Sequence, residues 1–482
     1  MSKSCCETPR NRPWLWLLFG GAAAIVIAVF IGATRTTSVS APSDPLVVEL
    51  EGSYASASRP DGQLRTFAIT AAPAQLIKPD GAPLEVWAYN GQVPGPTLRV
   101  RIGDTVRIEF KNELPQPTTI HFHGVRVPNA MDGVPGVTQP AVPPGGSFVY
   151  EFPAVDAGTF WFHPHVRSSE QVERGLYGVL VVEDDSPPAF TRELVWVVDD
   201  WKLAEDGQIA EPFNTRHDLA HDGRWGNVVT TNGSRAPTFP ARPGERIRVR
   251  IVNVANGRVF KLDFGKVRAE GIAFDALYAR ESFDPSAMDL APGNRMDVDL
   301  VIPRGGSVEI SDRFTRTTHP VAVFEVGGDP VATPTFASPA AATVPHWKDA
   351  LSTPLTKELP LNAQRGGAFG IAWMIDGVAM QHTAHDHAAH TSFTLSRGRF
   401  HRLSFVNESG RLHPMHLHGT FFKVIARNGQ PADEPFFRDT VLVRPRERVD
   451  IGLVPHDVGT WMMHCHILEH AESGMMTLFA VE

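Results

Sequence analysis

With 482 residues, the chain is long enough for about three domains, each with a hydrophobic core of its own. Its 41 glycines, 40 prolines and frequent valine, threonine and phenylalanine favour short strands and turns, and they argue against a mainly helical protein. The net charge of -8, without clusters of lysine and arginine, argues against nucleic acid as a partner.

The first 43 residues predict an export signal. Basic residues precede an almost purely apolar run at residues 14–33, and Val39-Ser40-Ala41 offers a small-residue cleavage site. Such a run is either an uncleaved helix that spans a bilayer once, which we favour slightly, or a long signal-peptide core. We therefore expect residues 1–43 to be an export signal or membrane anchor. The rest of the chain is expected in the periplasm or another extracytoplasmic space, with anchoring to the inner membrane as one form.

A motif that occurs three times divides the remaining chain. Each copy has a turn glycine, alternating apolar positions and a closing asparagine, at residues 103–112, 244–253 and 398–407. Alternation with a period of two indicates a half-buried strand, and three copies indicate three related β-domains. We place the domains at residues 44–187, 188–330 and 358–482, with a linker rich in proline, alanine and threonine at residues 331–357.

Pairs of histidines follow the motif in the first and third domains. Nine residues past the closing asparagine lie His121-Phe122-His123 and His416-Leu417-His418, where the middle domain has Leu262-Asp263-Phe264. A second correspondence matches His163-Pro164-His165 with His464-Cys465-His466. Packing does not explain eight imidazoles at matching positions in two repeats and their loss from the third. We expect them to face one another across a domain boundary and to bind several metal ions.

Cys465 is the only cysteine beyond the first six residues, and potential copper ligands follow it closely. His470 comes five residues later and Met475 ten residues later. A thiolate, imidazoles and a weak axial thioether are the ligands of a blue-copper electron-transfer site. The side chains of His464 and His466 would point away from that of Cys465, because alternate residues of a strand face opposite sides. These two histidines therefore require a second metal centre.

Together these motifs resemble those of the multicopper oxidases, specifically the three-domain, laccase-like bacterial enzymes. The resemblance rests on residues 121–124, 163–165, 413–418 and 464–475, and it covers nearly the whole chain after the N-terminal segment. It implies an all-β fold of three cupredoxin-like Greek-key domains, preceded by the N-terminal hydrophobic helix. In such a fold the middle domain has no copper ligands.

The resemblance also implies four copper ions and their ligands. The type 1 copper, in the third domain, would be bound by His413, Cys465, His470 and Met475. The type 2 copper, between the first and third domains, would be bound by His121 and His416. The two type 3 ions would be bound by six further histidines: His123, His163, His165, His418, His464 and His466.

An oxidase activity follows from the same resemblance. Such an enzyme takes four electrons, one at a time, from a reducing substrate and reduces dioxygen to water. Phenols or aromatic amines are the expected donors, because the type 1 site of this family opens to the surface at a histidine edge. One alternative is a Cu(I) or other metal-ion oxidase in periplasmic copper tolerance, although Ser409-Gly410-Arg411 stand where cuprous oxidases have acidic and methionine residues. A non-catalytic copper-binding or scaffold protein is another.

Reduction of dioxygen consumes protons, so carboxylates are expected near the metal ions. Glu469, between His466 and His470, and Asp132, in a Met-Asp-Gly sequence, are the expected proton-relay residues and act in catalysis together with Cys465. Each could instead be an ordinary turn residue. Asp439 matches a recurrent family segment, and we expect it to have a structural hydrogen-bonding role.

A histidine-rich tract begins the third domain. It contains His382, His385, His387 and His390, with Met374 and Met380 shortly before it. It could capture copper near the type 1 site. We favour a polar, mobile loop, because flexible histidines without fixed geometry bind metals weakly.

Overall fold

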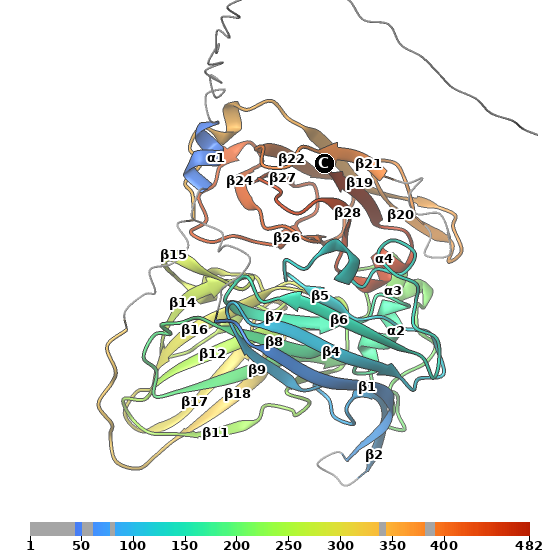
Figure 1. The fold of residues 1–482 in the computed structure, drawn as a ribbon. Helices are drawn as coiled ribbons and strands as arrows, with labels where there is room; N and C mark the ends of the chain where they lie inside the picture. The colour runs from blue at the N-terminus through green and yellow to red at the C-terminus, as the bar shows by residue number, and fades with distance from the viewer. Residues whose placement is uncertain (1–43, 51–60, 78–81, 337–343, 381–390) are drawn as a thin grey trace, which may run out of the picture. The chain divides into compact units, whose positions relative to one another are not determined.

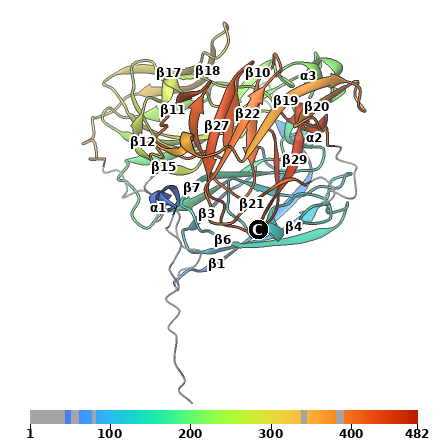
Figure 2. The same ribbon diagram turned by 90° about the horizontal axis from the view of Figure 1, so that it is seen from above.

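The computed structural model describes residues 44–50, 61–77, 82–336, 344–380 and 391–482 (Figures 1 and 2). The predicted export signal or anchor at residues 1–43 and the histidine tract at residues 382–390 lie outside the described residues. None of the helices in the described part of the chain is long and apolar enough to cross a membrane. An anchor at residues 14–33 therefore stays a prediction.

Strands dominate the described residues and form six sheets, as predicted for an all-β protein. The first two sheets come from residues 64–183, with the strand orders β2-β1-β4-β6 and β3-β8-β7-β5. Their strands are β1 (Leu64–Ile77), β2 (Pro83–Tyr89), β3 (Thr97–Arg101), β4 (Thr105–Asn112), β5 (His121–His123), β6 (Ser147–Pro153), β7 (Gly158–His163) and β8 (Gly178–Glu183). Short helices flank them: α1 (Pro45–Leu50), η1 (Asn129–Met131) and α2 (Ser168–Glu173).

The next two sheets come from residues 192–326, with the orders β10-β9-β12-β16-β14-β15 and β11-β18-β17-β13. Their strands are β9 (Arg192–Trp201), β10 (Val228–Thr231), β11 (Thr238–Ala241), β12 (Arg246–Asn253), β13 (Leu262–Asp263), β14 (Arg268–Phe274), β15 (Leu277–Phe283), β16 (Arg295–Val301), β17 (Gly306–Asp312) and β18 (His319–Val326). The short helices α3 (Arg216–Ala220) and η2 (Pro285–Ala287) lie in the connections.

The last two sheets come from residues 357–481, with the orders β20-β19-β22-β27-β24-β25 and β21-β29-β28-β23-β26. Figure 2 shows β19, β22 and β27 side by side. The strands are β19 (Lys357–Arg365), β20 (Ile371–Ile375), β21 (Thr391–Leu395), β22 (His401–Asn407), β23 (His413–Leu417), β24 (Lys423–Arg427), β25 (Gln430–Pro431), β26 (Thr440–Val443), β27 (Arg448–Leu453), β28 (Gly459–Cys465) and β29 (Met476–Val481). The short helices are η3 (Ala350–Ser352), before β19, and α4 (Leu468–Glu472).

The three copies of the repeat are the strands β4, β12 and β22, as the alternation predicted. Burial alternates along β4, which is the half-buried pattern expected from its sequence. The same expectation is wrong for β12, because every residue of β12 is buried. The arginines at alternate positions of β12 are buried and form ion pairs with aspartates of the neighbouring strand β16. Arg246 pairs with Asp299, and Arg248 pairs with Asp297 at 2.5 Å.

The asparagine that closes each copy ties the strand end to the next turn. Its side-chain oxygen accepts a hydrogen bond from the backbone N–H two residues later, at 2.9 Å for Asn112 and Asn407 and 3.0 Å for Asn253. Its amide also donates to a distant backbone carbonyl, that of Val142 or Leu290 in the first two copies. These hydrogen bonds fix the conformation of the turn that follows the strand, which explains why asparagine belongs to the repeat.

Each pair of sheets encloses its own hydrophobic core, with Phe110, Ile251 and Phe405 as fully buried examples. The first core extends to Phe421 and Phe437 of the third domain. The first and third domains are therefore packed directly on each other, which brings their histidine strands to a common boundary.

We predict that Asn253→Ala lowers the free energy of unfolding by about 1–3 kcal/mol, because it leaves buried backbone groups without partners. Urea unfolding of the purified protein measures this change. The exposed Gln75, which bonds to Glu85, provides the control variant Gln75→Ala. Equal stability of the two variants would show that the turn does not depend on the asparagine.

Candidate metal centres

The four histidine motifs lie on two equivalent pairs of strands. β5 pairs with β7 so that His121 lies opposite His163, and β23 pairs with β28 so that His416 lies opposite His464. The repeat comparison predicted this equivalence from sequence alone. Each strand pair brings its four imidazoles to one place, and all eight are buried.

The two sets of imidazoles meet between the first and third domains. Several ring contacts join them, including His121 with His418 (centroids 3.9 Å apart), His123 with His416 (3.7 Å), His165 with His464 (5.2 Å) and His163 with His466 (5.4 Å). Nitrogen atoms of His165, His418 and His464 lie within 4.8 Å of one another, as do those of other triplets in the cluster. The structure thus brings together all eight predicted cluster ligands.

The outward ring nitrogens of these histidines are fixed by hydrogen bonds. Backbone carbonyls lie 2.8–3.1 Å from Nδ1 of His121, His163, His416 and His464, and carboxylates lie 2.8 and 3.0 Å from His418 Nδ1 and His123 Nε2. A ring nitrogen that donates its hydrogen outward leaves the lone pair of the other nitrogen for a metal ion.

The inward nitrogens fit metal ions. Seven buried imidazoles have a ring nitrogen that no described protein atom hydrogen-bonds: His121 Nε2, His123 Nδ1, His163 Nε2, His165 Nε2, His416 Nε2, His418 Nε2 and His466 Nδ1 and Nε2. Buried polar atoms without partners are costly, so their convergence is explained by a bound cation. Burial, followed by the neighbouring imidazoles, also holds the pKa of His165 and His418 well below the ordinary value. Neutral imidazoles of this kind are the form that binds metals.

A second buried cluster contains Cys465. Its Sγ lies 3.6 Å from Nδ1 of His413 and 3.7 Å from Nδ1 of His470, and these two nitrogens are 3.2 Å apart. Met475 is fully buried in the same hydrophobic cluster, and its carbonyl accepts the Cys465 N–H at 3.0 Å. Burial raises the pKa of the Cys465 thiol, so a bound cation is needed to stabilise its thiolate. The predicted blue-copper ligands are therefore together.

Asp132 connects the two halves of the histidine cluster. Its Oδ2 lies 2.8 Å from His418 Nδ1 and its backbone oxygen 2.8 Å from His121 Nδ1, so one residue orients imidazoles of both domains. The next residue, Gly133, has φ +79°, and a side chain there would meet the Ile120 carbonyl at 1.9 Å. The Met-Asp-Gly turn thus fixes Asp132 in place.

Glu469 is fully buried on α4 and hydrogen-bonds to the middle domain. Asn256 Nδ2 donates to its Oε1 at 2.8 Å, and the Arg224 backbone N–H donates to its Oε2 at 3.1 Å. Burial raises the pKa of Glu469 to about 7. The carboxyl group can therefore gain and lose a proton near neutral pH.

Arg295, which begins β16 in the middle domain, was not predicted from the sequence as a site residue. Its Nη2 donates to Asp439 Oδ2 at 2.6 Å and its Nη1 donates to Oδ1 at 2.9 Å, while Asp439 Oδ1 lies 3.0 Å from His123 Nε2. Both charged residues are fully buried. A domain without histidine pairs thus orients a histidine of the cluster. The available signal was the run Arg295, Asp297 and Asp299, with charges at alternate positions of an otherwise apolar strand.

The Cys465 cluster is closed to solvent, unlike the open histidine edge expected from the resemblance. His470 Nε2 is hydrogen-bonded to the His221 carbonyl at 2.6 Å, and His413 Nε2 to Ser409 Oγ at 2.8 Å. The Trp373 ring lies 4.2 Å from that of His470. Neither imidazole is exposed, because residues of the middle and third domains cover both.

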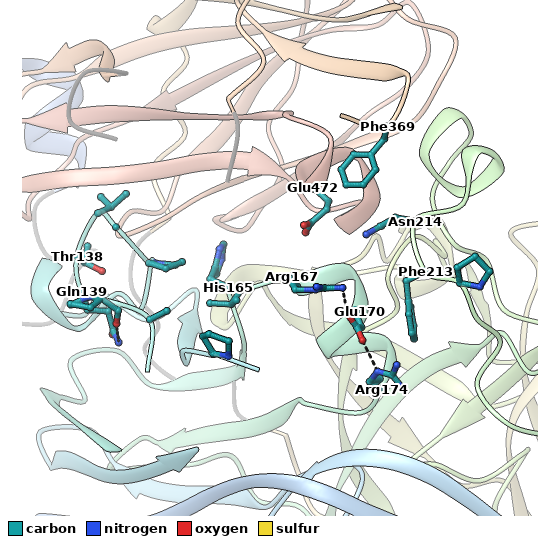
Figure 3. Close-up of a pocket in the computed structure, with 18 of the residues that line it drawn as sticks. Thr138, Gln139, His165, Arg167, Glu170, Arg174, Phe213, Asn214, Phe369 and Glu472 are labelled. Carbon is teal, nitrogen blue, oxygen red and sulfur yellow. Dashed lines mark hydrogen bonds and ion pairs between the residues drawn. The ribbon is translucent and has the colours of Figure 1, made fainter. Parts of the chain in front are cut away.

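A cavity of about 1260 Å³ reaches the histidine cluster (Figure 3). His165 forms part of its wall, together with Arg167 and Glu170, and Figure 3 shows the ion pairs that join Glu170 to Arg167 and Arg174. All three domains line the cavity. Of the cluster histidines, His165 lines it, so the cavity reaches one edge of the histidine cluster.

Multicopper oxidases and laccases are found among the family models, relatives and solved structures similar to this chain. Two family models described as multicopper oxidase match residues 71–187 and 352–482. The chain is 29% identical to the multicopper oxidase MmcO of Mycobacterium tuberculosis (88% of each chain covered) and 25% identical to Laccase-2 of Cryptococcus neoformans (92% and 88%). It is 30% identical to a multicopper oxidase structure from Pseudomonas thermotolerans, with a TM-score of 0.78 and 88% and 100% coverage. The predicted cupredoxin-like fold is thereby confirmed.

We predict that Arg295→Met lowers the free energy of unfolding by about 3–5 kcal/mol, because Asp439 remains buried without its partner. Arg295→Lys is the matched control, which keeps the charge but not the paired hydrogen bonds and should cost less. Urea unfolding of both variants, with copper content per chain, tests this. If the methionine variant is as stable as the lysine variant, the ion pair does not organise the site.

Proposed function

Because the chain belongs to the multicopper oxidase family, we propose that its two buried clusters bind the type 1, type 2 and type 3 copper ions of that family. His413, Cys465, His470 and Met475 would bind the type 1 ion, and His121 and His416 the type 2 ion. The type 3 ions would be bound by two triplets: His123, His163 and His466, and His165, His418 and His464. Converging nitrogen atoms in the second of these triplets support the assignment.

The chain is an oxidoreductase that uses copper and dioxygen. When bound, the copper ions supply one-electron redox chemistry and the reduction of dioxygen to water. The protein supplies the path between them: Cys465 is bonded through its backbone to His464 and His466. The carbonyl of Cys465 is also hydrogen-bonded to His464 Nδ1 at 2.9 Å. This single strand thus connects the two clusters covalently.

Protons for water formation would pass through buried carboxyl groups. Glu469 is suited to this role because its pKa lies near 7. Asp132 contacts His418 directly, so it can hold or pass a proton beside the cluster. We therefore propose Glu469 and Asp132 as the proton-relay residues.

The electron donor proposed here is a low-valent metal ion, Cu(I) or Fe(II). The covered type 1 site carries this proposal, because an aromatic substrate cannot place its ring against the edge of His413 or His470. A small ion needs only a surface position joined to these imidazoles by backbone and hydrogen bonds. A laccase-type oxidation of phenols or aromatic amines is the second candidate, supported by relatives named laccases.

A non-catalytic copper-binding or scaffold role is disfavoured, because every predicted ligand is buried in one of the two clusters, with His466 beside His163 and Met475 packed in the same core as Cys465. The oxidase would work outside the cytoplasm, as the N-terminal sequence at residues 1–43 suggests. A periplasmic or similar location is part of this proposal.

We predict that Cys465→Ser lowers oxygen consumption by at least about 100-fold with every donor, because the path between the clusters loses its thiolate. The histidine cluster should still fill, so copper content should fall by one ion per chain. Oxygen electrode measurements and metal analysis check both results. Equal rates in the variant and the parent protein would contradict an oxidase that works through this cysteine.

We also predict that kcat/KM for Cu(I) or Fe(II) exceeds that for a methoxyphenol or an aromatic amine by roughly tenfold or more, because the covered site hinders contact with larger donors. Oxygen consumption on the four donors, corrected for the reaction without enzyme, provides the comparison. The reverse order would favour the laccase-type candidate.

A further inference from the structure

His217 and His221 form an imidazole pair near the surface that the copper assignments do not use. They lie four residues apart, on and just after α3, and therefore on one face of that turn. Their rings stack with centroids 4.2 Å apart and an interplanar angle of 12°. The side chain of His217 is 72% exposed, and His221 is half-buried. His221 Nδ1 is hydrogen-bonded to the His217 carbonyl at 2.9 Å, so Nε2 is the His221 nitrogen that can bind a ligand.

This segment is in direct contact with the proposed type 1 ligands. The carbonyl of His221 is the partner of His470 Nε2 at 2.6 Å. The carbonyl of Leu219 accepts a hydrogen bond from Trp373 Nε1 at 2.7 Å, and the Trp373 ring packs on His470. An ion held by the His221 side chain would therefore be separated from His470 by one residue and one hydrogen bond.

The segment is held in place at both ends. Thr215 and Asp218 form a capping box at the start of α3, and Asp218 also accepts a hydrogen bond from Lys202 Nζ at 2.9 Å. After the helix, Asp222 Oδ1 accepts the backbone N–H of Leu412 at 2.9 Å, which ties the segment to the third domain. The imidazole pair is thus presented by a fixed turn that covers the type 1 site.

We propose that His217 and His221 bind one Cu(I) ion as a substrate and form the site at which electrons are donated. Imidazole is a suitable ligand for copper, and two histidines four residues apart on one helical face can each place a nitrogen on the same ion. Stacked rings direct their nitrogen lone pairs in parallel, so the exposed His217 side chain turns about its own bonds to bring its nitrogen to the ion at His221. This inference rests on the proposed metal-ion oxidation. Each bound Cu(I) is oxidised to Cu(II) and loses one electron, which passes along the His221 backbone and its hydrogen bond to His470. Four such electrons and four protons reduce one dioxygen to two waters, and each Cu(II) leaves.

The test uses the copper-loaded full chain and the double variant His217→Gln/His221→Gln, which keeps polar side chains. Cu(I) bound beyond the resident copper is measured without oxygen by competition with a chromophoric Cu(I) chelator. We expect the parent protein to hold one additional Cu(I) and the variant to lose it. The KM for Cu(I) should rise about tenfold, and the ratio of kcat/KM for Cu(I) to that for a methoxyphenol should fall by a similar factor. His401→Gln, at a half-buried histidine of β22, is the matched control.

His217→Gln alone provides a second variant, because its exposed side chain can be replaced without disturbing folding; it should show a weaker form of both effects. Retention of the additional Cu(I) and an unchanged KM in the double variant would overturn the inference. In that case Cu(I) oxidation by the parent protein would still support the proposed function. A different result is a parent protein that holds the additional Cu(I) but oxidises phenols faster than Cu(I). That result would overturn both the proposal that His217 and His221 hold the electron donor and the proposed metal-ion oxidation.

Discussion

The described structure depends on the burial of neutral imidazoles whose inward nitrogens face one another. These nitrogens are buried, and no described protein atom hydrogen-bonds them at His121, His163 or His418, which is costly without another partner. Outward hydrogen bonds fix the rings, as at His121 and His416, so the cost of burial is concentrated at the centre of the cluster. Metal ions at that centre would therefore join the first and third domains as well as perform chemistry.

The middle domain supplies no histidine pair, yet it supports both clusters. Arg295 acts through Asp439 on a cluster histidine, Asn256 holds Glu469, and the segment that ends at His221 covers the cysteine cluster. Its own buried charges are paired across β12 and β16, which makes a charged sheet possible in a dry interior. The middle domain therefore has no metal ligands of its own, but it is more than a spacer because its residues position the clusters.

Sequence alone predicted the strands of the repeat and the equivalence of the histidine pairs, because both depend on local alternation and on comparison within the chain. The ligand set of the cysteine cluster, with His413, was implied by the resemblance to the multicopper oxidases. It could not predict Arg295 or the cover over His470. Arg295 meets Asp439 across 144 positions of sequence, and His221 meets His470 across 249. Such contacts depend on how three domains pack, and no local pattern encodes that. The half-buried expectation for β12 was wrong because its buried arginines pair with aspartates of the neighbouring strand β16, which alternation along β12 alone does not reveal.

β28 contributes to both clusters from its two faces: Cys465 lies opposite Met415, and its neighbour His464 lies opposite His416. The two centres therefore share a single strand register. A slip by one residue would turn the thiolate towards the histidine cluster and a histidine towards the type 1 position, so both sites would be lost together. An insertion or deletion of one residue in this strand would therefore disrupt both centres at once. The position of one centre along the strand cannot change without the position of the other.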